Sequence, residues 1–295
     1  MSDPFSIAGQ WFKGNLHVHT TASDGRMTPQ ETVASYAEHG YDFLSITDHG
    51  AVTETAGLDD KGMLLIPGIE LDGGRTDLDS SYHMVAIGAK GPMEYDTQWS
   101  AQKLIDYGTE NAEFVFMAHP YWLSLTLADM IDLDGCIGLE VYNTFCHHDV
   151  GRGESGELWD DLLARDKRML GFAVDDAHGA ELDAWIGYIM VKASACEYDD
   201  IIEAIKAGSF YSSNGPTINN IQREGDRLLV ECSPCQEVCA VCPAPGLGGT
   251  NWRTEQKPPL TEIELQLFEG SNPVRIECID AEGNKAWSNP MWLPD

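Results

Sequence analysis

The chain has 295 residues, with 18 Lys and Arg against 48 Asp and Glu, and its formal net charge is −30. This length predicts one large domain, alone or with a smaller one, and is sufficient to bury a substantial core. The charge argues against nucleic-acid polymers and anionic membranes as partners, because both are bound by clustered Lys and Arg. The acidic residues are spread along the chain rather than gathered in a tail, which favours a role in solubility.

The first ten residues contain neither the basic segment nor the apolar core of a signal peptide. No uninterrupted apolar stretch approaches the length of a membrane-spanning helix. We therefore expect a cytoplasmic protein, in which the eight cysteines remain thiols.

Between residues 15 and 215, short apolar runs alternate with amphipathic stretches. We expect strands at 16–19, 43–47, 64–70, 83–88, 114–118, 138–142, 170–174 and 187–191. We expect helices at 29–39, 129–133, 157–165 and 198–207, the first of them capped by Thr28 with Pro29 at its first position. This alternation predicts an α/β fold with a parallel sheet or barrel, whose active site lies at the carboxyl ends of the strands.

From about Thr217 the pattern changes to short alternating strands separated by turn residues. These strands are expected at 219–224, 228–232, 238–242, 263–268, 274–279 and 286–292. They predict a small antiparallel β domain of the sandwich type. We therefore expect a first domain over residues 1–215 and a second over 216–295, joined near Ser212–Pro216.

Side chains that bind metals stand at the ends of most of the apolar runs. His17 and His19 are two residues apart, so on an extended chain both imidazoles point to the same side. Further imidazoles and carboxylates follow in Ser23-Asp24-Gly25, Thr47-Asp48-His49, Gly68-Ile69-Glu70, Tyr82-His83, Ala118-His119-Pro120 and Asp175-Asp176-Ala177-His178. Such ligands, without thiolates, suit Zn²⁺, Mn²⁺ or Fe²⁺. Their number predicts a multinuclear metal centre.

The set of these motifs and their order resemble the PHP family (polymerase and histidinol phosphatase) over about residues 12–215. The segments Leu139–Asn143, Phe210–Ser213 and Ala286–Pro290 are similar to the branch of that family related to carbaryl hydrolase. The resemblance implies a distorted (β/α)7 barrel and a metal-dependent hydrolase. It also implies three divalent ions per chain, with Mn²⁺ favoured and Zn²⁺ or Fe²⁺ as alternatives.

The resemblance also assigns ligands residue by residue. It implies a first metal held by His17, His19, Glu70 and Asp176, a second held by Glu70, His83 and His119, and a third held by Asp24, His49 and His178. Glu70 would bridge two ions, and Asp176 would also accept or transfer a proton. Arg26 is a third candidate catalytic residue, because its guanidinium would reach a substrate phosphate; the alternative is a surface cation.

Four residues are candidate substrate contacts: Arg26, Asn143, His147 and Ser213. For Asn143 and Ser213 the alternative is a turn at the end of a strand. For His147 the alternative is a solvated loop, in which we expect His148 as well. Trp122 is expected either to stack on an aromatic group or to lie in the core or at its rim.

The family supplies the function we expect, which is phosphoester hydrolysis of a small phosphorylated metabolite by a metal-bridged hydroxide. A phosphomonoester, a nucleotide phosphate and a cyclic phosphodiester all remain open as substrates. The alternative is a carbamate or carboxylic ester hydrolase with the same trinuclear centre. The net charge of −30 weighs against a nuclease, and the complete ligand set weighs against a non-catalytic scaffold.

Four cysteines follow the pattern Cys232-x2-Cys235-x3-Cys239-x2-Cys242. Paired C-x2-C motifs are typical of zinc or iron–sulfur sites, but zinc ribbons separate their two pairs by more residues. The surrounding alternation of apolar residues favours buried thiols on strands. The other cysteines, Cys278 among them, show no partner pattern.

Overall fold

The computed structural model describes residues 4–179, 183–243, 250–254 and 259–293. Its strands are β1 (Gln10–Asn15), β2 (Phe43–Ile46), β3 (Leu64–Gly73), β4 (Tyr82–Ile87), β5 (Phe114–Met117), β6 (Cys136–Asn143), β7 (Leu170–Val174), β8 (Tyr188–Ala193), β9 (Phe210–Ser213), β10 (Ile218–Glu224), β11 (Arg227–Cys235), β12 (Glu237–Val241), β13 (Thr250–Arg253), β14 (Leu260–Gln266), β15 (Arg275–Ile279) and β16 (Lys285–Ser288). Within these residues, one sheet has the order β13-β12-β15-β16-β9-β8-β1-β2-β3-β4-β5-β6-β7 and the other has the order β10-β11-β14.

The large sheet is mixed. Parallel pairing joins β1 to β2 to β3 and β5 to β6 to β7, and the other neighbours are antiparallel. Strand β4 follows β3 without a helix, so it runs antiparallel to it, because a parallel neighbour requires a long crossover. The expected α/β class and small antiparallel sheet are confirmed, whereas the uniform strand–helix alternation is wrong at this point.

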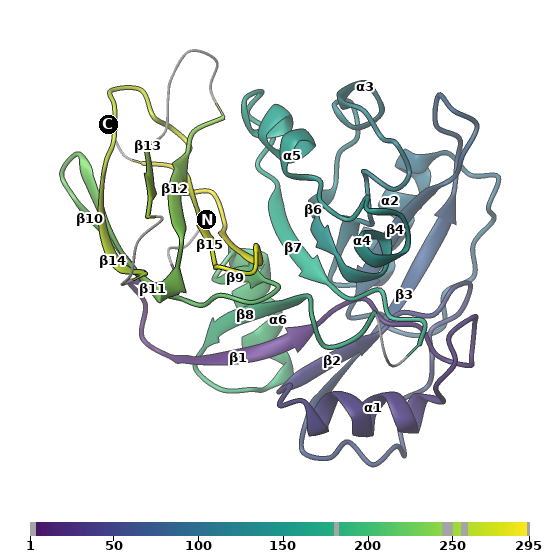
Figure 1. Ribbon diagram of the computed structural model, residues 1–295. Coiled ribbons are helices and arrows are strands. Elements are labelled where there is room, and N and C mark those ends of the chain that lie inside the picture. The colour runs from purple at the N-terminus through teal and green to yellow at the C-terminus, as the bar shows by residue number, and fades with distance from the viewer. Residues whose placement is uncertain (1–3, 180–182, 244–249, 255–258, 294–295) are drawn as a thin grey trace.

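Helices lie against the part of the large sheet that runs from β8 to β6 (Figure 1). They are α1 (Pro29–Glu38), α2 (Ala101–Asn111), α3 (Leu127–Met130), α4 (Thr144–Val150), α5 (Gly156–Leu163) and α6 (Tyr198–Ala207). Thr28 caps α1 as expected, with its side chain accepting from the backbone N–H of Glu31. The sequence did not predict α2 or α4. His147 and His148 therefore lie on a helix, not in the loop we expected.

The first strand ends earlier than predicted. Strand β1 pairs with β8 and β2 and ends at Asn15, so His17 and His19 lie just beyond it. The chain remains extended there, because the backbone N–H of Thr47 donates to the carbonyl of Val18 and the N–H of His19 donates to that of Ala177. Both imidazoles consequently still point to the same side, as the spacing predicted.

Aromatic side chains fill the core beneath the parallel strands. Phe116 of β5 and Phe210 of β9 stack on Phe172 of β7, with ring centroids 4.5 and 4.9 Å apart. A separate core lies between the two sheets of the C-terminal part, where Val230 and Leu265 meet Val238 and Ile276. This arrangement of two facing sheets matches the sandwich pattern expected from the sequence.

The large sheet runs across the predicted domain boundary, because β16 pairs with β9 through Trp287 and Ser212. Figure 1 shows β10 to β15 on one side, β2 to β7 on the other, and β1, β8 and β9 between them. The buried Arg275 of β15 also joins the two parts, since Nε and Nη2 each donate to a carboxylate oxygen of Asp160 in α5 at 2.8 Å. The boundary between residues 215 and 216 stays a prediction.

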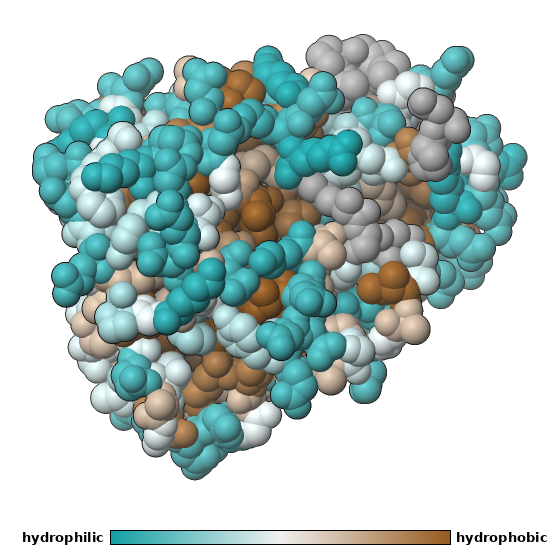
Figure 2. All heavy atoms as spheres, turned by 180° about the vertical axis from the view of Figure 1, so that it is seen from behind, coloured by the Kyte–Doolittle hydropathy of each residue, from teal (hydrophilic) through white to brown (hydrophobic). Residues whose placement is uncertain are grey.

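Hydrophilic side chains cover most of the face seen in Figure 2, and hydrophobic atoms show mainly in the hollows between them. This surface agrees with the net charge of −30. No helix in the described part of the chain is both long enough and apolar enough to span a membrane.

We expect Arg275→Ala to lower the free energy of unfolding by about 3 kcal/mol, because it leaves the partly buried Asp160 and Glu277 without their cation. The matched control is Arg165→Ala, which removes an exposed pair with Asp161 in the same helical region and should cost less than about 1 kcal/mol. Urea unfolding of both variants measures the difference. Equal losses would contradict the role assigned to Arg275.

Candidate metal centre

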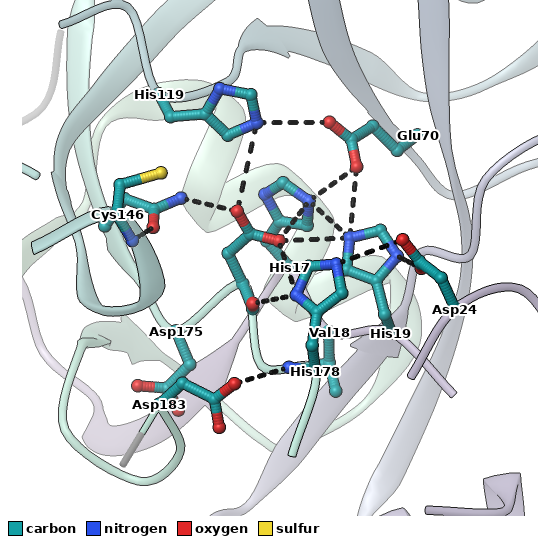
Figure 3. Close-up of polar contacts among 12 residues, drawn as sticks. His17, Val18, His19, Asp24, Glu70, His119, Cys146, Asp175, His178 and Asp183 are labelled. Carbon is teal, nitrogen blue, oxygen red and sulfur yellow. Dashed lines mark hydrogen bonds and ion pairs between the residues drawn. The ribbon is translucent and has the colours of Figure 1, made fainter. Parts of the chain in front are cut away.

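Four buried side chains converge just beyond the ends of β1 and β7 and on β3 (Figure 3). The Nε2 atom of His17 lies 3.1 Å from Nε2 of His19 and 3.0 Å from Oε2 of Glu70. The Nε2 atom of His19 lies 3.0 Å from both Glu70 Oε2 and Asp176 Oδ1. Four potential donor atoms therefore surround one point, as the sequence predicted for the first metal.

Glu70 extends the cluster in a second direction. Its other oxygen, Oε1, lies 2.8 Å from Nδ1 of His83 and 3.3 Å from Nε2 of His119. The same His119 nitrogen lies 3.8 Å from Asp176 Oδ2. The carboxylate of Glu70 thus stands between two groups of imidazoles, which is the position that a bridging ligand requires.

A third group surrounds Asp24 at the mouth of the cluster. Oδ2 of Asp24 lies 3.4 Å from Nε2 of His178 and 3.8 Å from Nε2 of His49. The ring of His19 packs between those two histidines, with centroids 4.3 Å from His178 and 4.6 Å from His49. All nine predicted ligands therefore lie together, while the ion that each would hold stays a prediction.

Glu140 orients two of the histidines, and sequence analysis gave it no role. Its Oε1 lies 2.7 Å from Nδ1 of His17, and its Oε2 accepts from the backbone N–H of His119 at 2.7 Å. With the proton of His17 on Nδ1, the lone pair of Nε2 faces the centre. The only signal in the sequence is a carboxylate inside the apolar run of β6.

Asn143 is buried, and its amide is fully engaged within the protein. Nδ2 donates to Glu140 Oε2 at 2.8 Å and to Asp176 Oδ2 at 3.0 Å, while Oδ1 accepts from the backbone N–H of Cys146. These bonds give Asn143 a positioning role, in which it holds Asp176 and caps α4. The predicted contact with a substrate stays a prediction.

Two other candidate substrate contacts lie away from the cluster. The hydroxyl of Ser213 is buried, donates to the carbonyl of Pro216 and accepts from the N–H of Gly215, so it forms a turn. His147 is exposed on α4 and faces a separate hollow with Tyr142. The structure thus does not bring Ser213 and His147 to the cluster, and their predicted contacts with a substrate stay predictions. The side chain of Arg26 is exposed beside the centre, and its backbone N–H donates to the carbonyl of His178; its predicted role stays untested.

The cluster forms the floor of an open pocket of about 230 Å³. Its lining comprises Asp24, His49, Glu70, His83, His119, Trp122, Phe145, Cys146, Asp176 and His178. The ring of Trp122 lies 5.2 Å from that of His119, and the ring of Phe145 lies 4.6 Å from that of His178. Among the described residues, neither Lys nor Arg lines this pocket.

The residues fit divalent cations by their burial and their unsatisfied atoms. Nδ1 of His119 is buried without a hydrogen-bond partner, and the buried Oδ1 of Asp176 faces the Nε2 atoms of His17 and His19 at 3.3 and 3.0 Å. Both residues also have positive φ angles, 55° for Asp176 and 27° for His119, a backbone strain of roughly 1–3 kcal/mol each. Facing carboxylates and imidazole lone pairs are unfavourable in a buried site unless a cation lies between them.

The cluster also shifts the pKa values of its own members. Burial alone would lower the pKa of His17, but the charges of Asp176, Glu70 and Glu140 raise it well above the ordinary value. Burial likewise opposes the change at His19, whose hydrogen bonds to Asp176 and Glu70 raise its pKa to about 9. Burial would raise the pKa of Glu70, but the charge of His17 holds it well below the usual range. The metal-free centre therefore keeps His17 and His19 protonated and Glu70 ionised at neutral pH.

Comparison with solved structures places this fold among known proteins. No family model matches the chain, and no curated protein is significantly similar to it in sequence. A solved two-domain protein containing a predicted PHP-like metal-dependent phosphoesterase, from Bacteroides vulgatus, matches with a TM-score of 0.53 and 15% identity over 96% of both chains. An amidohydrolase from Chromobacterium violaceum with bound sulfate and no metal matches with a TM-score of 0.47 and 14% identity, over 67% of this chain and 96% of that chain. At this identity the first match shows a shared fold over nearly the whole chain.

Cation binding must displace the protons of His17 and His19, so we expect the affinity for Zn²⁺ or Mn²⁺ to rise with pH. The raised pKa of His19 stabilises the metal-free fold below the ordinary pKa of about 6.5, and this contribution is lost as the pH rises through about 9. The increase in Tm on adding metal should therefore grow between pH 6.5 and 9. Affinity should rise by about tenfold per pH unit for each proton displaced.

Calorimetric titrations in buffers of different ionisation enthalpy measure the number of protons released. A metal-induced shift in Tm that stays constant from pH 6.5 to 9, with no proton release, would contradict this account of the centre.

Glu140→Gln should weaken metal binding by about 10- to 100-fold while the protein remains folded, because the neutral amide no longer holds the Nδ1 proton of His17 as firmly. Glu110→Gln on the exposed side of α2 is the matched control and should bind as wild type. Equilibrium dialysis against Mn²⁺ compares the two. Wild-type affinity in Glu140→Gln would show that Glu140 does not position His17.

Proposed function

We propose that this chain is a metal-dependent phosphoesterase that hydrolyses a small phosphorylated metabolite. The observation that carries the proposal is the buried carboxylate of Glu70, whose two oxygens face separate groups of imidazoles. Paired cation sites that share a carboxylate suit the hydrolysis of phosphoesters. The shared fold with the two-domain protein from Bacteroides vulgatus, which contains a predicted phosphoesterase of this kind, supports the assignment.

In this proposal three divalent ions occupy the centre. His17, His19, Glu70 and Asp176 would hold the first, Glu70, His83 and His119 the second, and Asp24, His49 and His178 the third. When bound, such ions lower the pKa of a coordinated water and offset the negative charge of a phosphoryl group. Mn²⁺ is the favoured ion, with Zn²⁺ or Fe²⁺ as alternatives, because Asp24 adds an oxygen donor to the third group.

The residues of the chain supply position and proton transfer. Asn143 fixes Oδ2 of Asp176, which leaves Oδ1 facing the centre as a proton acceptor. Trp122 and Phe145 flank the pocket and would exclude water from the apolar side of a bound substrate. Arg26 would contact an outer oxygen of the substrate from the rim, where its side chain is exposed.

The size and charge of the protein support a small substrate. A pocket of about 230 Å³ accommodates a group of metabolite size, and a net charge of −30 disfavours nucleic-acid polymers and anionic membranes as partners. A cytoplasmic location is part of the same proposal. So is membership of the PHP branch related to carbaryl hydrolase, with β1 to β7 as a distorted form of the (β/α)7 barrel. The match with the two-domain protein from Bacteroides vulgatus supports the PHP-like fold, and the segments Leu139–Asn143, Phe210–Ser213 and Ala286–Pro290 are the basis for the branch.

One observation favours a second candidate function, the hydrolysis of a carbamate or carboxylic ester. In the described part of the chain no Lys or Arg lines the pocket, so inside it the metals alone would offset the charge of a phosphoryl group, with Arg26 reaching only an outer oxygen from the rim. A neutral ester carries no negative charge that the pocket would have to offset. The two functions differ in their leaving groups and are separated by turnover of each substrate class.

We expect Glu70→Gln and His17→Ala to lower kcat/KM by at least about 100-fold and to reduce the metal content, because both remove donors from the centre. His39→Ala is the control, since His39 stacks on Trp185 outside the centre and should leave activity unchanged. The assay measures phosphate release from phosphomonoesters, nucleotides and cyclic diesters, alongside carboxylic esters and carbamates. Wild-type turnover by metal-replete Glu70→Gln would refute the proposal, and activity on the neutral esters alone would favour the second candidate.

A further inference from the structure

Three cysteines lie close together in the C-terminal part of the protein, on other strands than the His and carboxylate cluster. Cys232 and Cys235 lie on β11, and Cys278 lies on β15. Their sulfur atoms all lie within 4.8 Å of one another, and all three side chains are buried. Strand β11 belongs to the small sheet and β15 to the large one (Figure 1). The thiols therefore meet in the core between the two sheets of the sandwich.

The convergence requires an irregular strand. Residues three apart on a regular strand point to opposite faces, so Cys232 and Cys235 should not both be inside. A register shift against β14, between Glu231 and Cys235, changes this alternation. Every second residue from Leu228 to Cys232 is buried. Cys235, three residues after Cys232, is buried as well, so the alternation changes between them. The bulge thus turns both thiols of the C-x2-C motif toward Cys278.

The second half of the cysteine motif does not take part. On β12, Val238 and Ala240 face the core, whereas Cys239 is half-buried and contacts Glu237 and Asn251. The sequence pattern of four neighbouring cysteines is therefore not one site. Instead Cys278, for which we expected no partner, joins the first pair from the facing sheet.

We propose that Cys232, Cys235 and Cys278 form a thiolate site for one thiophilic d¹⁰ cation, Cu⁺ or Zn²⁺, which clamps the two sheets of the C-terminal part together. Thiolates select these soft ions over the harder Mn²⁺ of the main centre. Binding exchanges the thiol protons for the cation and links two strands whose inward side chains pack in a shared apolar core.

The number of donors distinguishes the two ions. Among the described residues, no fourth Cys, His, Asp or Glu joins the three sulfurs. Three sulfurs alone suit a trigonal Cu⁺ ion, whereas Zn²⁺ takes four ligands and would need a further oxygen or nitrogen donor. The carbonyl of Leu260, 3.8 Å from Sγ of Cys232, is the nearby oxygen that the structure offers.

The test uses the full-length chain, metal-free and reduced, under anaerobic conditions. Cu⁺ and Co²⁺, a coloured substitute for Zn²⁺, are added separately, and absorption from sulfur-to-metal charge transfer is followed, because histidine and carboxylate ligands do not produce it. We expect one of these ions to give a band whose final intensity corresponds to one thiolate-bound ion per chain, because ions taken up by the main centre add no such absorption. A band with Cu⁺ alone identifies copper, and a band with Co²⁺ alone identifies zinc.

Variants locate the site. Cys278→Ala and Cys235→Ala should lose the band, whereas Cys239→Ala should keep it, since Cys239 lies on the neighbouring strand outside the cluster. Cys146→Ala should keep it too, which excludes the thiol that lines the main pocket. If the first two variants do not fold, X-ray absorption of the wild-type complex decides by counting sulfur ligands. The absence of a band in the wild type with both ions, or a disulfide among the three cysteines in reduced-buffer preparations, would overturn the proposal.

Discussion

The whole centre depends on one buried carboxylate on the longest strand of the large sheet. Strand β3 lies between its parallel neighbour β2 and its antiparallel neighbour β4. The backbone of Glu70 pairs with that of Val85 on β4 and forms an isolated β-bridge with that of His49. This position lets the two oxygens of Glu70 face different imidazoles. A negative charge so deeply buried is tolerated only where cations or protonated groups surround it. The imidazoles of His17, His19, His83 and His119 surround the carboxylate of Glu70 and meet this requirement.

Further buried polar groups hold the donors without facing the pocket. Asp48 accepts hydrogen bonds from Thr20, Ser23 and Thr53, and so shapes the loop that carries Asp24. Asp175 accepts hydrogen bonds from the backbone N–H groups of residues 185–187 and from the hydroxyl of Tyr36. These bonds fix the chain directly before Asp176, which is a candidate metal ligand. Part of the acidic composition is therefore internal and positions other groups, and the rest serves the surface.

The convergence of these side chains could be predicted from the sequence because few side chain types bind divalent metals and these stood beside apolar runs in an order that resembles the PHP family. The residues that position these side chains could not be predicted. Glu140 lies within an apolar strand and leaves no periodic signal, and Asn143 is as typical of a turn as of a helix cap. Helix α4 is short and polar, so it lacks the apolar spacing that predicts helices. The link from Cys232 to Cys278 depends on a bulge and on the packing of two sheets, and neither is encoded locally.

The central claim is that nine side chains form one multinuclear site for divalent metals, and counting bound Mn²⁺ tests it most directly. Mn²⁺ is suited to the oxygen and imidazole donors of the main centre and not to thiolates, so the cysteine cluster does not enter the count. Elemental analysis of the reconstituted, desalted wild-type protein should give close to three Mn²⁺ per chain, as the three donor groups around Glu70 require. Less than one Mn²⁺ per chain, in a protein that remains folded, would contradict the account.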